Sequence, residues 1–270
     1  MRLINKAVII GLIGIVSLAS AVSADRATLA NNDWDGMTRA SWYAGDRYAT
    51  DDLDDPAMLR NPSGVLALPD GTVIVADTSN HLIKRIKGNT VEWFSGVNIL
   101  RDDRDLPVGS LLDGSVDSSA FNQPIGLDSD AEGNIYVADA GNHAIRKIAP
   151  DGTVTTIAGD GVLGFRDGVG SEARFYYPSD VAVAADGSIY VADTLNHAIR
   201  KIDKNGRVTT LNAASERIVE VIPGIVVEAG DYRDGRLANA LFNEPSGLAL
   251  DELGNLYVSD SGNQRIRYID

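Results

Sequence analysis

The chain has 270 residues, of which 24 are Lys or Arg and 38 are Asp or Glu, so its formal net charge is −14. It contains no cysteine, which excludes disulfides, thiol chemistry and thiolate metal sites. The excess of acidic residues argues against binding to nucleic acid or to an anionic membrane surface, because both need clustered Lys and Arg.

The first 24 residues have the pattern of a secretory signal peptide. Arg2 and Lys6 precede an uncharged run over residues 7–21, and Val22-Ser-Ala24 is typical of a cleavage site. We therefore expect a secreted or cell-wall-associated protein with no membrane insertion after cleavage, and an uncleaved anchor is the alternative. Cleavage would leave 22 basic and 38 acidic residues, a net charge of −16. Residues 25–39 follow as an N-terminal segment.

One sequence motif occurs four times along the rest of the chain. In each copy a proline is followed fifteen residues later by an aspartate, with a glycine six residues before the aspartate and an asparagine three residues after it. Fixed internal spacing indicates one supersecondary unit that is used repeatedly. The four copies run from Pro62 to Asp77, Pro124 to Asp139, Pro178 to Asp193 and Pro245 to Asp260.

Each unit reads as four short strands. In the third copy the strands are residues 181–184, 188–192, 198–202 and 207–211, each of which contains at least two β-branched or aromatic residues, and Gly, Asp and Asn separate these runs. Four antiparallel strands per unit describe the blade of a β-propeller. We therefore predict an all-β propeller over residues 40–270, with repeats near 62–96, 124–159, 178–211 and 245–270. On the third strand the isoleucines should face inward, and Arg146, Lys147, Arg200 and Lys201 should face water.

The residues that follow the second strand resemble the NHL repeat family. The stretch Tyr190–Ile202 carries the Asn196-His197 pair that gives the family its name, and equivalent stretches begin at residues 73, 135 and 256. Between the blades the order Asp-Gly, Phe, Pro is similar to secreted bacterial NHL proteins. Some of these are joined to a stalk domain similar to the N-terminal domain of copper amine oxidases. The resemblance implies a β-propeller.

The number of blades is open at this stage. The chain reaches Ile269-Asp270 where the fourth strand of the last repeat should begin. Either residues 40–44 close that blade from the N-terminal side, or the four repeats are a fragment of a longer ring. The family resemblance favours the fragment, because NHL propellers usually have five or six blades.

The repeated Asp-x-x-Asn turns are candidate functional residues. Their carboxylates could ring the mouth of the central channel, but Asp and Asn also stabilise turns by accepting backbone N–H groups two residues on, and we favour this structural role. All three histidines occupy one repeat position, so none is left to act as an irregular metal ligand or base. The turn aspartates are Asp77, Asp139, Asp193 and Asp260, and the structural motif comprises Asn80, His81, Asn142, His143, Asn196, His197 and Asn263.

Two insertions interrupt the symmetry of the repeats. Residues 97–112 carry a charged run that includes Arg101 and Arg104, and residues 212–228 are rich in Val and Ile. Both should emerge on the same face as the Asp-x-x-Asn turns, which makes this face, with Arg101 and Arg104, the candidate binding surface. Without a binding role, residues 101–105 would be a solvated loop and residues 218–227 an extra hairpin packed on a blade edge.

The sequence predicts a non-enzymatic binding scaffold without a cofactor, whose partner is a protein or a carbohydrate of the cell envelope. The alternative is a gluconolactonase-like hydrolase that holds a divalent cation, such as calcium, in the central channel through Asp, Glu and Asn. Asp128-Ser-Asp-Ala-Glu-Gly133 imitates a calcium loop, but strands replace the flanking helices, and we interpret it as a hairpin turn.

Overall fold

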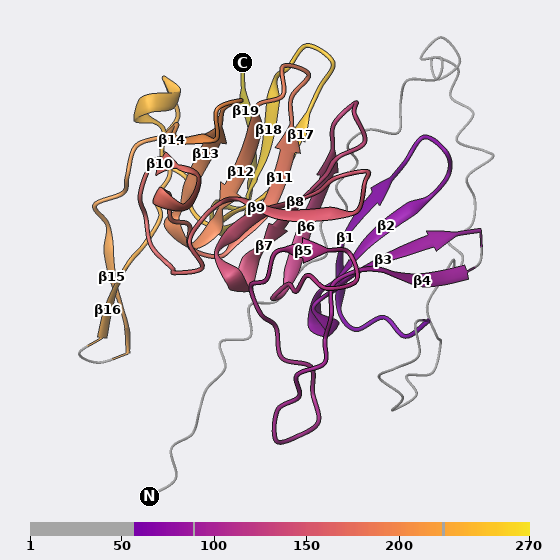
Figure 1. Ribbon diagram of the computed structural model, residues 1–270. Helices are drawn as coiled ribbons and strands as arrows, with labels where there is room; N and C mark the ends of the chain where they lie inside the picture. Colours follow the sequence, from indigo (N-terminus) through magenta and orange to yellow (C-terminus); the bar gives the residue numbers. More distant parts are fainter. Residues whose placement is uncertain (1–56, 89, 223–224) are drawn as a thin grey trace, which may run out of the picture.

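The computed structural model describes residues 57–88, 90–222 and 225–270, which form antiparallel sheets and short 3₁₀ turns without an α-helix. Figure 1 shows four sheets arranged as the blades of a β-propeller, as predicted. The predicted signal peptide, the N-terminal segment and residues 40–44 lie outside the described residues. Within the described part, no helical segment has the length and hydropathy needed to cross a bilayer.

The first two blades each contain four consecutive strands, and the second gains a short outer strand. Blade one consists of β1 (Pro62–Ala67), β2 (Val73–Asp77), β3 (Leu82–Lys87) and β4 (Thr90–Ser95). Blade two consists of β5 (Gly114–Ser115), β6 (Pro124–Ser129), β7 (Ile135–Asp139), β8 (Ala144–Ile148) and β9 (Thr153–Ala158), with β5 outside β9.

Blade three repeats this plan, blade four has three strands in the described residues, and a separate hairpin lies between them in the sequence. Blade three consists of β10 (Gly168–Val169), β11 (Pro178–Val183), β12 (Ile189–Asp193), β13 (Ala198–Ile202) and β14 (Arg207–Thr210). The hairpin is formed by β15 (Ile218–Ile222) and β16 (Ile225–Glu228), and blade four by β17 (Pro245–Leu250), β18 (Leu256–Asp260) and β19 (Arg265–Ile269).

Short 3₁₀ turns complete the repeat. After the second strand of each blade, one turn contains the asparagine of the motif: η2 (Thr78–Asn80), η3 (Ala140–Asn142), η5 (Thr194–Asn196) and η7 (Ser261–Asn263). Two more lie in the connections before blades three and four: η4 (Gly170–Glu172) and η6 (Leu237–Asn239).

The spacing of the repeat is a consequence of strand register. In every blade the marker proline and aspartate are cross-strand partners at one end of the first two strands, as in Pro178↔Asp193. A register shift follows the proline each time, which is the signature of a β-bulge. The fifteen-residue interval therefore fixes one hairpin with one bulge, and this geometry recurs around the propeller.

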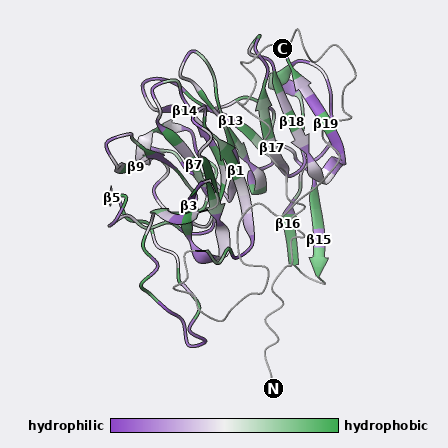
Figure 2. Ribbon diagram, turned by 90° about the vertical axis from the view of Figure 1, so that its right-hand side faces the viewer, coloured by the Kyte–Doolittle hydropathy of each residue, from purple (hydrophilic) through white to green (hydrophobic). Residues whose placement is uncertain are grey.

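The hydrophobic core lies between blades. Ile74 and Ile83 of blade one pack against Leu127 and Val137 of blade two, and equivalent clusters join blade two to blade three and blade three to blade four. The inner strands follow one another in space in the order β1, β6, β11 and β17. Figure 2 shows hydrophobic strands running through the stacked sheets. Both faces of an interior blade are thus buried, unlike the one-sided sheets of a sandwich.

The repeated histidines link each blade to the next. Each caps its 3₁₀ turn in the left-handed conformation, with φ between 52° and 59°. Its Nδ1 accepts the backbone N–H of the residue that precedes the next blade's proline, as between His143 and Tyr177 at 3.1 Å. Burial lowers the pKa of all three histidines, which favours the neutral imidazole that can accept this bond.

Candidate functional site

The four repeated aspartates are buried inside the blades, with no exposed surface. One carboxylate oxygen of Asp193 accepts the N–H of Tyr176 at 2.8 Å, and the other accepts the amide of Asn196 at 2.8 Å. The same two bonds recur at Asp77, Asp139 and Asp260. The expected bond to an N–H two residues on is therefore wrong, because the carboxylate instead holds the chain seventeen residues before it.

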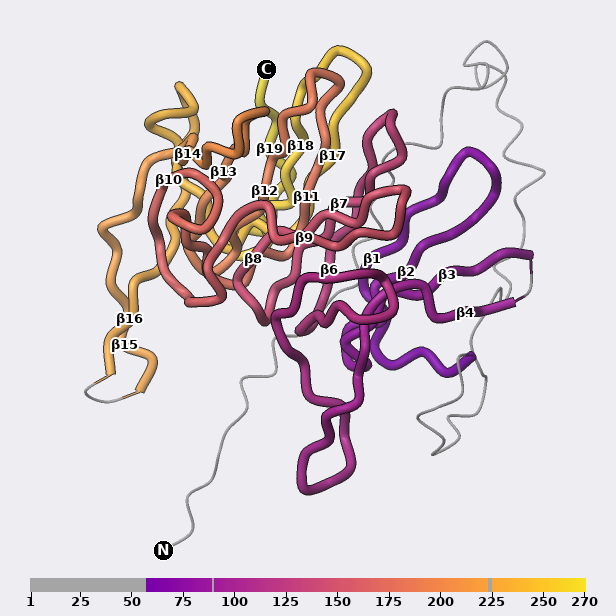
Figure 3. The backbone as a smooth tube through the Cα atoms, viewed as in Figure 1, coloured from indigo at the N-terminus to yellow at the C-terminus, as the bar shows by residue number. Residues whose placement is uncertain are grey.

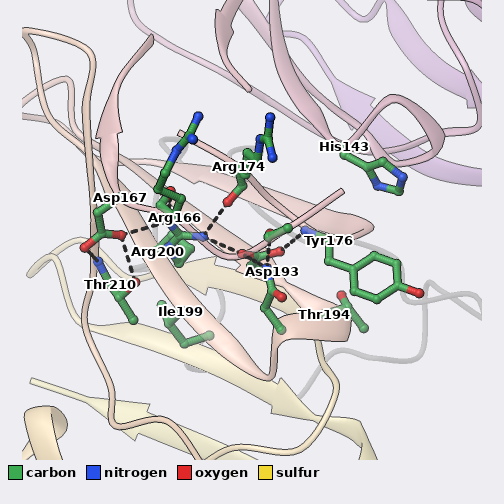
Figure 4. A network of polar contacts seen from close by, with 12 residues as sticks. His143, Arg166, Asp167, Arg174, Tyr176, Asp193, Thr194, Ile199, Arg200 and Thr210 are labelled. Atoms are coloured by element: carbon green, nitrogen blue, oxygen red, sulfur yellow. Dashed lines mark hydrogen bonds and ion pairs between the residues drawn. The ribbon is translucent and has the colours of Figure 1, made fainter. Parts of the chain in front are cut away.

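A buried cation completes the arrangement. Figure 4 shows Arg200 between Asp193 and Asp167, at 2.6 Å and 2.8 Å from their oxygens. Arg200 and its equivalent Arg146 have no exposed side-chain surface, so the prediction that they face water is wrong. The chain that enters the blade covers this face of the strand, because the further partners of Arg200 at Arg166, Asp167 and Arg174 all lie in that connection. The charge can be buried because a carboxylate and several acceptors meet it.

The Asp and Phe of the motif between the blades contact the same buried arginine. Asp167 also accepts the N–H and hydroxyl of Thr210 on the outer strand, at 3.1 Å and 2.9 Å. The guanidinium of Arg200 donates to the carbonyls of Arg166 and Arg174 and lies 5.0 Å from the ring of Phe175. We call this unit, an aspartate at the end of the second strand with a buried cation and its acceptors, the clamp.

The clamp varies among the blades in a regular way. Arginine fills it in blades two, three and four, through Arg146, Arg200 and Arg267. In blade one Lys84 pairs with Asp77 at 3.0 Å and donates to the carbonyl of Met58. Burial raises the pKa of Asp139 and Asp193 to about 6 against the opposing effect of the adjacent guanidinium.

The first insertion lies against the turns of blades one and two. The amide of Asn142 donates to the carbonyl of Ser110 at 2.8 Å, and Asn98 approaches the carbonyl of Asn80 at 3.5 Å. Arg101 donates to the carbonyl of Asn98, whereas Arg104 is 77% exposed and faces acidic neighbours within the loop. The tube in Figure 3 shows this loop extending from the lower side of the blades. The structure thus places the insertion beside the turns but keeps their aspartates inside.

A groove of about 380 Å³ opens where the first insertion leaves blade one. Trp93 on β4, 46% exposed, forms one wall, and Ile99, Arg101 and Asp117 contribute from the insertion and from blade two. Trp93 is the cross-strand partner of Lys84, the clamp cation of blade one. In blade two the equivalent partner of Arg146 is Thr156. The groove therefore lies where blade one departs from the repeat, and it combines an indole with polar groups.

Two carboxylates lie on the inner strands: sequence analysis assigned Asp128 to a hairpin turn and did not identify Asp180. Asp128 on β6 and Asp180 on β11 are each 5% exposed. Asp128 accepts the N–H of Val183 and Asp180 the N–H of Leu248, both at 2.7 Å, so each reaches the inner strand of the next blade. Burial raises the pKa of Asp128 to about 6 and that of Asp180 to about 7. Aligning the four repeats could have revealed them, since glycine, alanine or leucine stands at the equivalent positions.

These carboxylates do not assemble a cation site in the described part of the chain. Within residues 57–88, 90–222 and 225–270, no group of three or more Asp, Glu, His or Cys side chains is placed to hold a metal. The stretch of residues 128–133, which imitates a calcium loop in sequence, leads from β6 into the hairpin turn before β7, as predicted. In this turn Asp130 accepts the N–H of Asn134 at 2.8 Å.

Comparison with protein families finds the NHL repeat at residues 59–86, 121–148, 175–202 and 242–267. Protein SUPPRESSOR OF QUENCHING 1, chloroplastic, from Arabidopsis thaliana is 32% identical over 258 residues, which are 90% of this chain and 22% of that protein. NHL repeat-containing protein 2 from Bos taurus is 31% identical over 166 residues, covering 56% of this chain and 21% of that protein. The chain thus spans about a fifth of these relatives.

Solved structures share the fold at lower identity. An auxiliary nutrient binding protein from Bacteroides thetaiotaomicron matches with a TM-score of 0.58 and 22% identity, over 80% of this chain and 49% of that one. A protein of unknown function from the same organism matches with a TM-score of 0.57 and 23% identity, over 77% and 47%. At this level of identity the likeness shows the propeller fold alone.

Removing a clamp cation should destabilise the protein strongly. We expect Arg200→Met to lower the free energy of unfolding by about 3–5 kcal/mol, because Asp193 would be left buried without its partner. Lys201→Met, on the neighbouring residue of the same strand, should change it by less than about 1 kcal/mol. Urea unfolding of both variants measures the difference, and equal effects would refute a buried ion pair at Arg200.

Asp180 should make stability fall as pH rises. Its folded pKa of about 7 lies above the unfolded value of about 3.9, so the stability present below pH 4 is lost as pH rises through 7. The Asp180→Asn side chain cannot ionise. The difference in the free energy of unfolding between this variant and the wild type should therefore shift in favour of the variant by roughly 2–3 kcal/mol from pH 5 to pH 8. Exposed Asp103→Asn is the control for urea unfolding at both pH values. If the free energies of unfolding of Asp180→Asn and the wild type differed by the same amount at both pH values, the raised pKa of Asp180 would be contradicted.

Proposed function

Because this chain belongs to the NHL repeat family of β-propellers, we propose that it is a non-enzymatic binding scaffold of the cell envelope whose ligand is an oligosaccharide. The proposal includes secretion through the N-terminal signal sequence. The observation that carries it is the groove at Trp93, where blade one and the first insertion depart from the repeat. Ligand contacts on loops held by a rigid framework are the usual arrangement in proteins.

The composition of the groove favours a sugar. Its volume of about 380 Å³ is within the range of small-ligand sites, about 300–1,000 Å³. A half-exposed indole offers a flat apolar surface to the C–H face of a pyranose ring. Arg101, Asn98 and Asp117 line the same groove, and their polar groups suit the hydroxyls around such a ring.

The proposal excludes a role for the clamp in ligand binding. The turn aspartates are fully buried, and each is engaged by a backbone N–H, an asparagine and a cation. The ligand should therefore meet the insertion and the outer strand of blade one, while the clamps hold these segments in place.

Trp93→Ala should weaken oligosaccharide binding at least tenfold, since loss of a central aromatic contact costs about 1.4 kcal/mol or more. Isothermal titration with soluble cell-wall oligosaccharides, peptidoglycan fragments among them, measures this change. Tyr268→Ala is the matched control, because Tyr268 is 55% exposed on blade four and away from the groove. No binding by the wild type across the set, or equal losses in both variants, would overturn the proposal.

A further inference from the structure

Blade four lacks an outer strand among the described residues. In the other three blades the third strand pairs on its outer side with a fourth, as in Arg200↔Thr210 and Lys201↔Thr209 of blade three. The equivalent strand β19 pairs with β18 alone and forms the edge of its sheet, as Figure 2 shows. Such an edge presents a row of backbone N–H and C=O groups to which another strand can pair. The described residues therefore leave a place for one strand beside β19.

The clamp of blade four shows the same gap. In blade three, Thr210 on the fourth strand donates its N–H and its hydroxyl to Asp167, at 3.1 Å and 2.9 Å. The equivalent Asp234 is met by Arg267 and by the hydroxyl of Tyr232, and within the described residues no fourth strand reaches it. Its side chain is 66% exposed, against 48% for Asp167. A strand beside β19 would bring a backbone N–H to this carboxylate.

One stretch of the chain before the described part has the sequence of such a strand. Residues 40–45 are Ala-Ser-Trp-Tyr-Ala-Gly, and residues 91–96 of blade one are Val-Glu-Trp-Phe-Ser-Gly. In blade one, Trp93 lies opposite the clamp cation, and Gly96 follows the strand with a φ of 103°, close to the 99° of Gly159 after the fourth strand of blade two. This backbone conformation favours glycine. The stretch thus matches β4 at the residue opposite the cation and at the residue that ends the strand.

The distance along the chain also suits a fourth strand. Gly45 precedes Pro62 by seventeen residues, and Gly159 precedes Pro178 by nineteen, so the interval is close to that between one blade's last strand and the next blade. Residues 45–56 link the stretch to the first described residue, and twelve residues can span up to about 40 Å. This is more than the diameter of a small domain, about 30 Å. The stretch can therefore reach β19 from blade one.

We propose that residues 40–44 pair antiparallel with β19 as the fourth strand of blade four, so that one segment of the chain ties the last blade to the first. Because both strands belong to one molecule, the pairing benefits from a high effective concentration and needs no second copy. It goes beyond the proposed sugar site and does not depend on it. The register of blade one places Trp42 opposite Arg267, Ser41 opposite Tyr268 and Ala40 opposite Ile269.

Engineered disulfides test the pairing and its register, because the chain has no native cysteine. Antiparallel partners have Cα atoms about 4.5–5.5 Å apart, which suits a disulfide. Mild oxidation of the full chain carrying Ser41→Cys and Tyr268→Cys should therefore form an intramolecular disulfide. Arg85→Cys with Glu92→Cys is the positive control, since these residues are partners at the equivalent position of blade one. Ser41→Cys with Lys201→Cys is the negative control, because β14 already pairs with that strand of blade three.

The rates of disulfide formation decide the outcome, measured by quenching free thiols and resolving the products on non-reducing gels. The pair at Ser41 and Tyr268 should react at least about tenfold faster than the pair at Ser41 and Lys201, because paired strands raise the effective concentration of the two thiols. Equal rates for these two pairs would overturn the proposal, as would no reaction at Tyr268 where the blade-one control reacts. A covalent dimer in place of the intramolecular bond would also overturn it, since a second copy would then supply the strand.

A proline substitution gives a readout that does not depend on cysteine. In blade two the N–H of Thr156 points away from β8 to Asp113, so the N–H of the preceding residue faces β8, and Ser41 is at the equivalent position. Ser41→Pro should therefore remove a bond to β19 and lower the urea midpoint by roughly 0.5–1 M. Asp33→Pro, outside the proposed strand, should leave the midpoint unchanged. An unchanged midpoint for Ser41→Pro, or equal shifts in both variants, would contradict the pairing.

Discussion

A charge that is buried in every blade constrains the rest of this structure. Arg200 has no exposed side-chain surface, and a guanidinium can remain there only if a carboxylate and enough acceptors surround it. Asp193 and two backbone carbonyls meet this condition. Because Asp193 lies on the second strand, Arg200 on the third and the two carbonyls in the incoming connection, the clamp ties that connection to strands that are already paired with each other.

The clamp explains why the repeat is so regular. The aspartate must end the second strand, the arginine must lie seven residues later, and the incoming chain must pass seventeen residues before the aspartate. A one-residue change in any of these intervals would move a charged group away from its partner. The two insertions are not bound by these fixed intervals. The proposed sugar groove lies where the first insertion leaves blade one.

The sequence alone allowed the blades to be predicted, because spacing and strand patterns are local signals. It could not show that Arg146 and Arg200 are buried, since a basic residue on an alternating strand normally faces water, and here the chain that enters the blade covers that face. The local pattern at Asp128 indicated a hairpin turn and that at Asp180 indicated nothing, and the distinct role of both becomes visible only by comparison of the repeats. A hairpin packed on a blade edge was one of two interpretations of residues 218–227, and the exposure of Val226 depends on where that hairpin lies relative to the blades.

Native-state hydrogen exchange of the amides bound to the buried aspartates tests the central claim most directly. The N–H groups of Asn122, Tyr176 and Asn243 lie outside the strands yet donate to Asp139, Asp193 and Asp260. If the clamps hold the blades, these amides should exchange only through global unfolding, with its full denaturant dependence. Exchange that is fast and independent of denaturant, like that expected for the exposed loop at Asp103, would contradict this account.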